Sequence, residues 1–146
     1  MGFFSRLFGN DDSNAANIRE SIRSEINIAE CIDAHMKWKG RLRSYLDGTS
    51  TEQLDPAVVC RDDQCVLGKW IHGTALNYFQ GDKDFHKLRS DHAHFHSVAG
   101  AVIKMVQEDD RAGSNELLKN EYARASRDVI QDLTELNKQL QTPGER

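Results

Sequence analysis

Proline, cysteine and long hydrophobic runs are all scarce in this sequence. The 146 residues contain only two prolines, Pro56 and Pro143, and this favours long helices over a many-stranded fold because proline interrupts regular elements. No stretch approaches the roughly 20 apolar residues that a membrane-spanning helix needs, and no signal-peptide core is visible, so we expect a cytoplasmic protein. The three cysteines, Cys31, Cys60 and Cys65, are then expected as thiols or metal ligands rather than as a disulfide framework.

The charge balance is mildly acidic. The chain carries 19 Lys and Arg against 23 Asp and Glu, a formal net charge of -4, which argues against nucleic acid as a partner. The length suits one domain with a real core and is too short for two. We expect that domain to span residues 15–141, between an N-terminal tail over 1–14 and a C-terminal tail over 142–146.

Apolar residues recur at helical spacing, in steps of mostly three, four or seven, in three long stretches. These stretches cover about residues 15–46, 82–110 and 115–140. Together with a shorter helical segment between the first two, they predict an all-α protein built as a four-helix bundle.

Local signals mark where the shorter helices begin and end. Gly48 is expected to end the first long helix, because glycine commonly terminates helices. Asp55-Pro56 has the pattern of a helix start, with aspartate as the cap and proline in the first turn. Asp62 and Asp63 are expected to open a further short helix that carries Cys65.

The first ten residues, MGFFSRLFGN, form a short apolar cluster around one arginine. Two interpretations stay open. The segment either forms an amphipathic turn that contacts a membrane surface or a partner, or it is a frayed terminus, as chain ends usually are.

Four residues are strong candidates for a metal site. They are His35, Cys65, His92 and His96. His92 and His96 are one helical turn apart, so their imidazoles point the same way, and both lie with His35 on apolar stripes that should face inward. A spaced histidine pair alone also fits two buried histidines with ordinary hydrogen bonds. The inward His35 and the segment around Cys65 favour a Zn²⁺ site with three nitrogens and one sulfur.

The remaining histidines and cysteines fit other roles. His94 is expected to face solvent, His86 lies off the apolar stripe, and His72 is either a surface residue or a group close to the site. Cys31 is expected in or near the core. Cys60 is expected as a buried thiol, with a resolving thiol for oxidised Cys65 as the alternative.

The segment Cys65-Val66-Leu67-Gly68-Lys69-Trp70 resembles the C-x-x-G-K-W signature of the chemoreceptor zinc-binding (CZB) domain family. His35 with the nearby Trp38, and the later His92 and His96, match the other marks of that family in order and spacing. The resemblance implies that His35, Cys65, His92 and His96 are the zinc ligands. It also implies that Trp38, Gly68 and Trp70 shape the site by packing, with glycine permitting a close backbone approach.

The same resemblance implies zinc-dependent signal regulation in bacteria. Zinc keeps Cys65 deprotonated, and a thiolate is the form that oxidants such as hypochlorous acid attack, so the cysteine is also the expected redox-reactive residue. We expect the signal to pass to a separate protein of a chemoreceptor or cyclic-di-GMP (diguanylate cyclase) pathway, and we expect a homodimer. The competing interpretation is a zinc-stabilised structural adaptor without a switch.

An enzyme is not expected. Four protein ligands leave no coordination position for a catalytic water. Ala93 stands where an H-E-x-x-H metalloprotease needs glutamate. A di-iron bundle needs carboxylates paired with histidines on several helices, and the inward faces carry too few of them.

Overall fold

The computed structural model describes residues 13–141, and this part of the chain contains helices and loops but no strands. The helices follow in the order α2 (Ser13–Glu25), α3 (Ile28–Asp47), α4 (Pro56–Val59), α5 (Val66–Ile71), α6 (Ala75–Phe79), α7 (Lys83–Gln107), α8 (Arg111–Lys119) and α9 (Glu121–Leu140). The prediction of an all-α protein is therefore confirmed. The tails, including the amphipathic cluster over residues 1–10, lie outside the described residues apart from 13 and 14.

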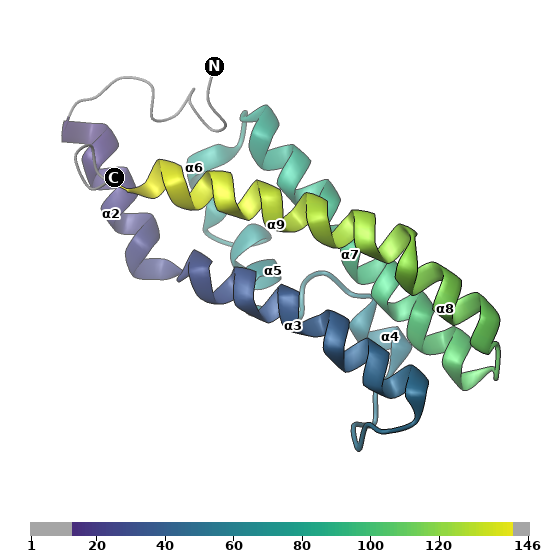
Figure 1. Cartoon of the computed structure of the whole chain (residues 1–146). Helices are drawn as coiled ribbons and strands as arrows, with labels where there is room; N and C mark the ends of the chain where they lie inside the picture. Colours follow the sequence, from purple (N-terminus) through teal and green to yellow (C-terminus); the bar gives the residue numbers. More distant parts are fainter. Residues whose placement is uncertain (1–12, 142–146) are drawn as a thin grey trace.

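Three long rods form the body of a helical bundle (Figure 1). One rod is α3, the second is α7, and α8 and α9 follow each other along the third. Helix α7 packs along α9, and α3 packs against both. The short helices complete the bundle, with α4 on α7 and α5 between α3 and α6. This agrees with the predicted bundle and its additional short segment near the cysteine.

The first predicted helix is interrupted. The pattern indicated one helix over 15–46, but the structure breaks it at residues 26 and 27, between α2 and α3. Asn27 begins α3 by accepting a hydrogen bond from the Glu30 backbone N–H at 3.1 Å. Ile22 and Ile28, both buried, are six residues apart, a step that would turn the apolar stripe away from the core in a continuous helix. The break lets both halves face the core.

The last predicted helix is also two helices. The pattern indicated one helix from 115 to 140, whereas α8 begins at Arg111 and α9 begins after Asn120. The Asn120 backbone leaves helical geometry, with φ -110 and ψ -82. Its side-chain amide donates to the Glu116 carbonyl oxygen at 3.1 Å and to the Glu116 carboxylate at 2.8 Å. Asparagine side chains compete in this way with the helical hydrogen bonds.

Other predicted boundaries are confirmed. Gly48 ends α3 in the left-handed conformation, with φ 79, which glycine adopts without a steric penalty. Asp55 caps α4 by accepting from the Ala57 N–H at 2.9 Å, and Pro56 occupies the first turn.

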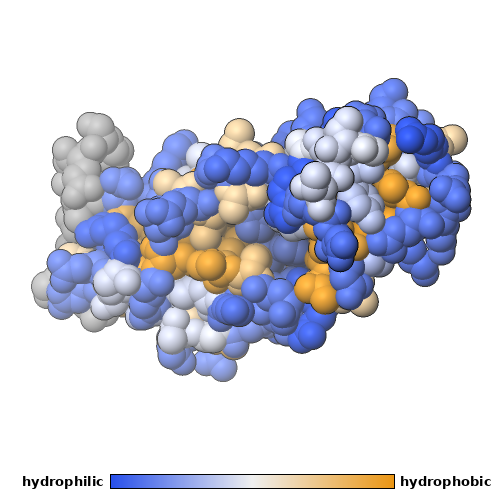
Figure 2. Space-filling view, turned by 90° about the horizontal axis from the view of Figure 1, so that it is seen from below, coloured by the Kyte–Doolittle hydropathy of each residue, from blue (hydrophilic) through white to orange (hydrophobic). Residues whose placement is uncertain are grey.

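The core lies between α3, α7 and α9. Its largest fully buried side chains are Tyr122, Phe79, Phe85, Phe95, Ile22, Leu42, Leu67, Ile71, Leu88, Ile103 and Leu133. The face seen in Figure 2 is mostly hydrophilic, with hydrophobic residues gathered along its middle and near one end. No helix in residues 13–141 is long and apolar enough to cross a membrane.

A charged cluster joins α7 to α9 at the edge of this core. Lys87 of α7 contacts Asp91 at 2.7 Å and Asp132 of α9 at 3.0 Å. The Asp132 side chain is only 1% exposed. Burial, followed by the neighbouring Asp91, raises the pKa of Asp132 to about 7, whereas that of Asp91 is lowered. Asp132 therefore exchanges its proton near neutral pH.

We predict that Asp132→Asn removes part of the pH dependence of stability. In the native protein Asp132 holds a proton that the unfolded chain loses above pH 3.8, so stability falls as pH rises toward about 7. As pH rises from 5 to 7, the free energy of unfolding of the variant should increase relative to that of the native protein, by at most about 1.4 kcal/mol per pH unit. Denaturant titrations measure this difference. Asp128→Asn, at an exposed position on the same helix, is the control. The prediction is contradicted if the stability difference between Asp132→Asn and the native protein does not change with pH.

Candidate metal centre

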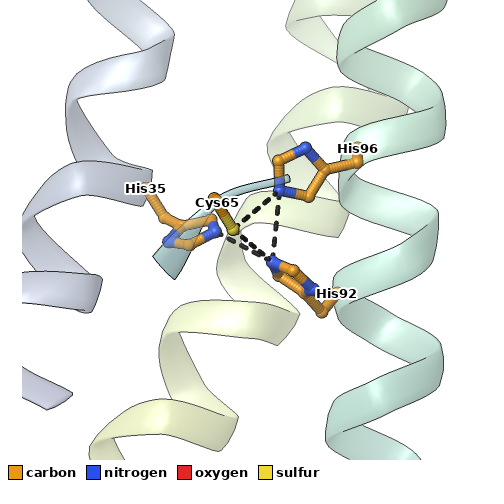
Figure 3. Close-up of side chains that lie close together, drawn as sticks. All are labelled: His35, Cys65, His92 and His96. Atoms are coloured by element: carbon orange, nitrogen blue, oxygen red, sulfur yellow. Dashed lines mark hydrogen bonds between the residues drawn. The ribbon is translucent and has the colours of Figure 1, made fainter. Parts of the chain in front are cut away.

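The structure brings the four candidate residues together from three parts of the chain (Figure 3). His35 comes from the middle of α3, His92 and His96 from neighbouring turns of α7, and Cys65 from the residue before α5. One potential ligand atom from each residue lies within 4.8 Å of all the others. The three histidines are buried and Cys65 is half-buried.

Four of the six separations between these atoms match a tetrahedral zinc site, and the other two are within 4.8 Å. The Cys65 sulfur is 3.4 Å from Nε2 of His92 and 3.6 Å from Nε2 of His96. Nε2 of His92 is 3.2 Å from that of His35 and 3.1 Å from that of His96. Zinc bonds of 2.0–2.1 Å to nitrogen and 2.3 Å to sulfur give tetrahedral edges of about 3.3 Å between two nitrogens and about 3.6 Å between nitrogen and sulfur.

Hydrogen bonds among the four side chains cannot account for this arrangement. Nδ1 of His35 lies 2.7 Å from the Cys31 carbonyl oxygen, and Nδ1 of His96 lies 3.0 Å from the Val59 carbonyl oxygen. A carbonyl only accepts, so both Nδ1 atoms carry the proton, and each neutral ring points an Nε2 lone pair inward. Nε2 of His92 lies close to the Cys65 sulfur and to the Nε2 atoms of His35 and His96. It carries either one proton or one lone pair, so it is able to form a hydrogen bond with only one of these three atoms. A cation among the four atoms removes this conflict.

Burial keeps the histidines in the form that binds metal. It is the main cause that lowers the pKa of His35, His92 and His96, and for His92, with the neighbouring His96 and His35 contributing, the pKa falls to about 2. Burial also raises the pKa of the Cys65 thiol. A metal ion that binds here therefore meets neutral imidazoles and must displace the proton of the thiol.

Cys65 itself begins helix α5. Its sulfur accepts a hydrogen bond from the Gly68 backbone N–H at 3.3 Å, the contact that a capping side chain makes. The expectation that Asp62 and Asp63 open this helix is therefore wrong, because both lie in the loop before it. The cap holds the sulfur at a backbone N–H that favours the thiolate.

Gly68 allows this loop to lie against α5. A Cβ on Gly68 would stand 1.7 Å from the backbone carbonyl oxygen of Asp62, a separation that no side chain tolerates. The predicted close approach of backbone is therefore real, and its partner is the loop that leads into Cys65. We infer that Gly68 shapes the site by this contact.

The two tryptophans of the predicted site differ in their surroundings. Trp38 lies beside Cys65 along two hollows in the surface, and the Arg41 guanidinium stacks over its ring at 3.7 Å. Trp70 is buried in the core, donates to the Glu25 carboxylate at 3.1 Å and packs edge-on against Phe79. Trp38 is thus a neighbour of the centre, whereas these contacts of Trp70 point toward α2 and α6.

The two hollows give solvent a route to Cys65. One has a volume of about 370 Å³ and reaches Cys65 and His96, and the other has about 590 Å³ and reaches Cys65 and His35. Both are bordered by Trp38 and Arg41. Of the four candidate ligands Cys65 is the least buried, so it is the one that a small molecule from solvent would meet first.

The other histidines lie at the surface. His94 is exposed and contacts Glu121 at 3.2 Å, as predicted for a solvent-facing residue. His86 is exposed and hydrogen-bonds the Gln80 carbonyl, and His72 is exposed with Nε2 at 2.8 Å from Asp62. None of these three belongs to the cluster found among the described residues.

The two remaining cysteines divide between core and surface. Cys31 is buried, as predicted, and burial raises its pKa to about 11. The prediction of a buried Cys60 is wrong. Its thiol is exposed and contacts the Ala57 carbonyl at 3.4 Å, while its backbone and Cβ fill the space beside Gly100 of α7. Cys60 therefore contacts α7 through its backbone and Cβ and leaves the sulfur outside.

The sequence interpretation missed the groups that orient the rings. The Cys31 carbonyl lies four residues before His35 on one helix, so that contact was recoverable from spacing. The Val59 carbonyl reaches His96 from 37 residues away, and nothing local to either residue indicates it.

Comparison with known proteins gives one family match. Residues 35–103 match the family model described as the chemoreceptor zinc-binding domain. All four clustered residues fall inside the matched range. No curated protein and no solved structure matches this chain.

We predict that Gly68→Ala destabilises the protein while Gly40→Ala does not. The added methyl of Gly68→Ala must push the Asp62 carbonyl away, and such overpacking costs about 1–3 kcal/mol. At Gly40, on α3, no atom lies within 4 Å of the added methyl, so the substitution should stabilise the helix by about 0.5–1 kcal/mol. Chemical unfolding of both zinc-loaded variants measures the contrast. Equal stability of the two variants would refute the tight packing at Gly68.

Proposed function

Residues 35–103 of this chain belong to the chemoreceptor zinc-binding family, and on this premise we propose that the protein binds one Zn²⁺ and acts in signal regulation. The proposed ligands are Nε2 of His35, His92 and His96 and the sulfur of Cys65. The observation that carries the proposal is the convergence of these atoms at tetrahedral separations with too few protons to bond one another.

The donor set supports zinc in particular. Imidazole nitrogen together with thiolate sulfur suits a borderline-soft ion without a strong geometric preference of its own. Carboxylate ligands, which Mg²⁺ and Ca²⁺ require, are absent from the cluster among the described residues. When bound, the ion would supply positive charge that holds the Cys65 thiolate and cross-links α3, α7 and the start of α5.

We propose a regulatory role rather than catalysis. Four protein donors complete a tetrahedron and leave no position at which water or substrate would be activated. The chemistry left to such a centre is gain or loss of the ion and reaction of its sulfur.

Cys65 is the residue that we propose to sense oxidants. It is half-buried at the meeting of two hollows, and its sulfur is a thiolate whenever the site is loaded. Hypochlorous acid converts such a thiolate to a sulfenic acid with release of chloride. A sulfenic acid is a poorer ligand, so oxidation would loosen the ion and with it the attachment of α5.

The proposed signal leaves through another protein chain. The family resemblance favours bacterial chemoreceptor or cyclic-di-GMP (diguanylate cyclase) signalling, exerted from the reducing cytoplasm, in which Cys65 stays reduced. A homodimer and a contact through residues 1–10 complete this proposal. Light scattering of the zinc-loaded protein tests the dimer.

A structural adaptor is the alternative function. The deep burial of His35, His92 and His96 favours an ion that stays in place. The two carbonyls that fix the rings of His35 and His96 favour it as well. In that case zinc binding serves folding alone.

We predict that Cys65→Ala lowers zinc affinity by more than about 100-fold. Removing a group that only hydrogen-bonds to a metal ligand lowers metal affinity by about 10–100-fold, and loss of the ligand itself should lower it further. Cys60→Ala is the matched control, because its thiol is exposed and bonds its own helical turn. Competition with a chromogenic chelator measures both affinities. If Cys65→Ala binds zinc as tightly as Cys60→Ala, Cys65 is not a ligand.

We predict that hypochlorite releases zinc through Cys65. One to a few equivalents should free the ion within the mixing time of the experiment, and a reductant should restore binding, since sulfenic acid is reversible. A zinc-sensitive dye follows the release, and the Cys60→Ala variant should respond like the native protein. Retention of zinc at modest oxidant excess would favour the adaptor over the sensor.

A further inference from the structure

Glu25, the last residue of α2, joins that helix to α5 and α6. Its Oε1 accepts from the Trp70 indole N–H at 3.1 Å and from the Thr74 hydroxyl at 2.9 Å. Its Oε2 accepts from the Tyr78 hydroxyl at 2.6 Å. One carboxylate of α2 thus receives donors from the end of α5, from the residue before α6 and from α6 itself.

The position of this carboxylate is unusual for a helix end. The carbonyl end of a helix carries partial negative charge, so a glutamate at the last position of α2 is disfavoured unless other groups compensate it. The three donors do so, and the Tyr78 hydrogen bond is the main reason that the pKa of Glu25 is lowered. Glu25 therefore serves the contact with α5 and α6 rather than α2 alone.

Helix α5 links this contact to the metal centre. Its first turn is capped by the Cys65 sulfur, and Trp70 follows five residues later near its end. The helix is six residues long, about 9 Å, and its start is wedged against the loop at Gly68. Helix α5 thus connects the Cys65 sulfur at its start to the Trp70 indole near its end.

Helix α2 is separately attached to the C-terminal end of α9. Arg19 Nε donates to the Gln139 carbonyl at 3.1 Å, and Arg23 donates to the Leu140 carbonyl, so two arginines cap the C-terminal end of α9. Figure 1 shows the end of α9 beside α2. The break at residues 26 and 27 separates α2 from α3, so the two are not one continuous helix.

We propose that α2 is the output element of the metal centre, and that α5 transmits the state of Cys65 to it through the Trp70–Glu25 hydrogen bond. The proposal rests on the proposed zinc site. With zinc bound, Cys65 holds α5 in place and the Glu25 carboxylate keeps its donors. When the sulfur leaves the centre, α5 shifts, these hydrogen bonds open and α2 loosens. Helix α2 precedes the family segment of residues 35–103, so this output belongs to the chain rather than to the matched domain.

Hydrogen–deuterium exchange of the full chain tests the relay, with and without a zinc chelator. In the native protein chelation should raise exchange throughout α2, residues 13–25. In Glu25→Ala the zinc-loaded α2 should already exchange faster, and chelation should change it little. Glu25 is exposed, so this variant keeps its core. Trp70→Phe keeps a ring against Phe79 but lacks the indole N–H, so its α2 should also respond little to chelation, while Thr74 and Tyr78 still donate to Glu25.

Arg23→Ala is the matched control. It removes a contact of α2 with α9 and leaves the Glu25 contacts in place, so its α2 should exchange faster yet still respond to chelation. Because coupling is reciprocal, Glu25→Ala should also weaken zinc binding about five-fold, while Arg23→Ala should leave it within about two-fold.

Two results overturn the relay while the zinc site stands. One is a native protein that binds stoichiometric zinc but whose α2 exchange ignores chelation. The other is a Glu25→Ala variant whose α2 responds like that of the native protein. A native protein that binds no zinc overturns the proposed function instead.

Discussion

Three imidazole nitrogens and one sulfur meet inside this bundle with too few protons to share among them, and the rest of the site depends on that shortage. Carbonyl oxygens fix the protons of His35 and His96 on the outer side of each ring, so the inner nitrogens present lone pairs. Buried lone pairs that face one another are costly without a cation. With a cation the same atoms hold α3, α7 and the start of α5 together. Burial, ring orientation and metal binding are therefore one property of the fold.

The course of the chain was largely predictable where local chemistry decides it. Gly48 and Asp55-Pro56 mark helix ends because backbone geometry requires residues of their type there. The breaks at Asn27 and Asn120 were missed, since asparagine is tolerated inside a helix and only tertiary packing shows which way its side chain turns. Periodicity identified the apolar faces but not the points at which a helix stops and restarts.

The site was predictable for a different reason. His92 and His96 share a helix face by spacing alone, and the apolar stripe of the first helix placed His35 on an inward face. The family signature then added to the case for Cys65 as the fourth ligand. Contacts between residues far apart in the sequence could not be predicted from the residues around them. The Val59 carbonyl, the exposed thiol of Cys60 and the approach of the Asp62 backbone to Gly68 all depend on how the segment between α3 and α7 folds back on the bundle.

X-ray absorption at the zinc edge tests the central claim most directly, because it reports the atoms around the ion without reference to stability or signalling. The account predicts one zinc ion per chain, surrounded by three nitrogens at about 2.0 Å and one sulfur at about 2.3 Å, with no bound water. A spectrum dominated by oxygen, one without a sulfur shell, or a metal-replete protein that contains no stoichiometric zinc would contradict it.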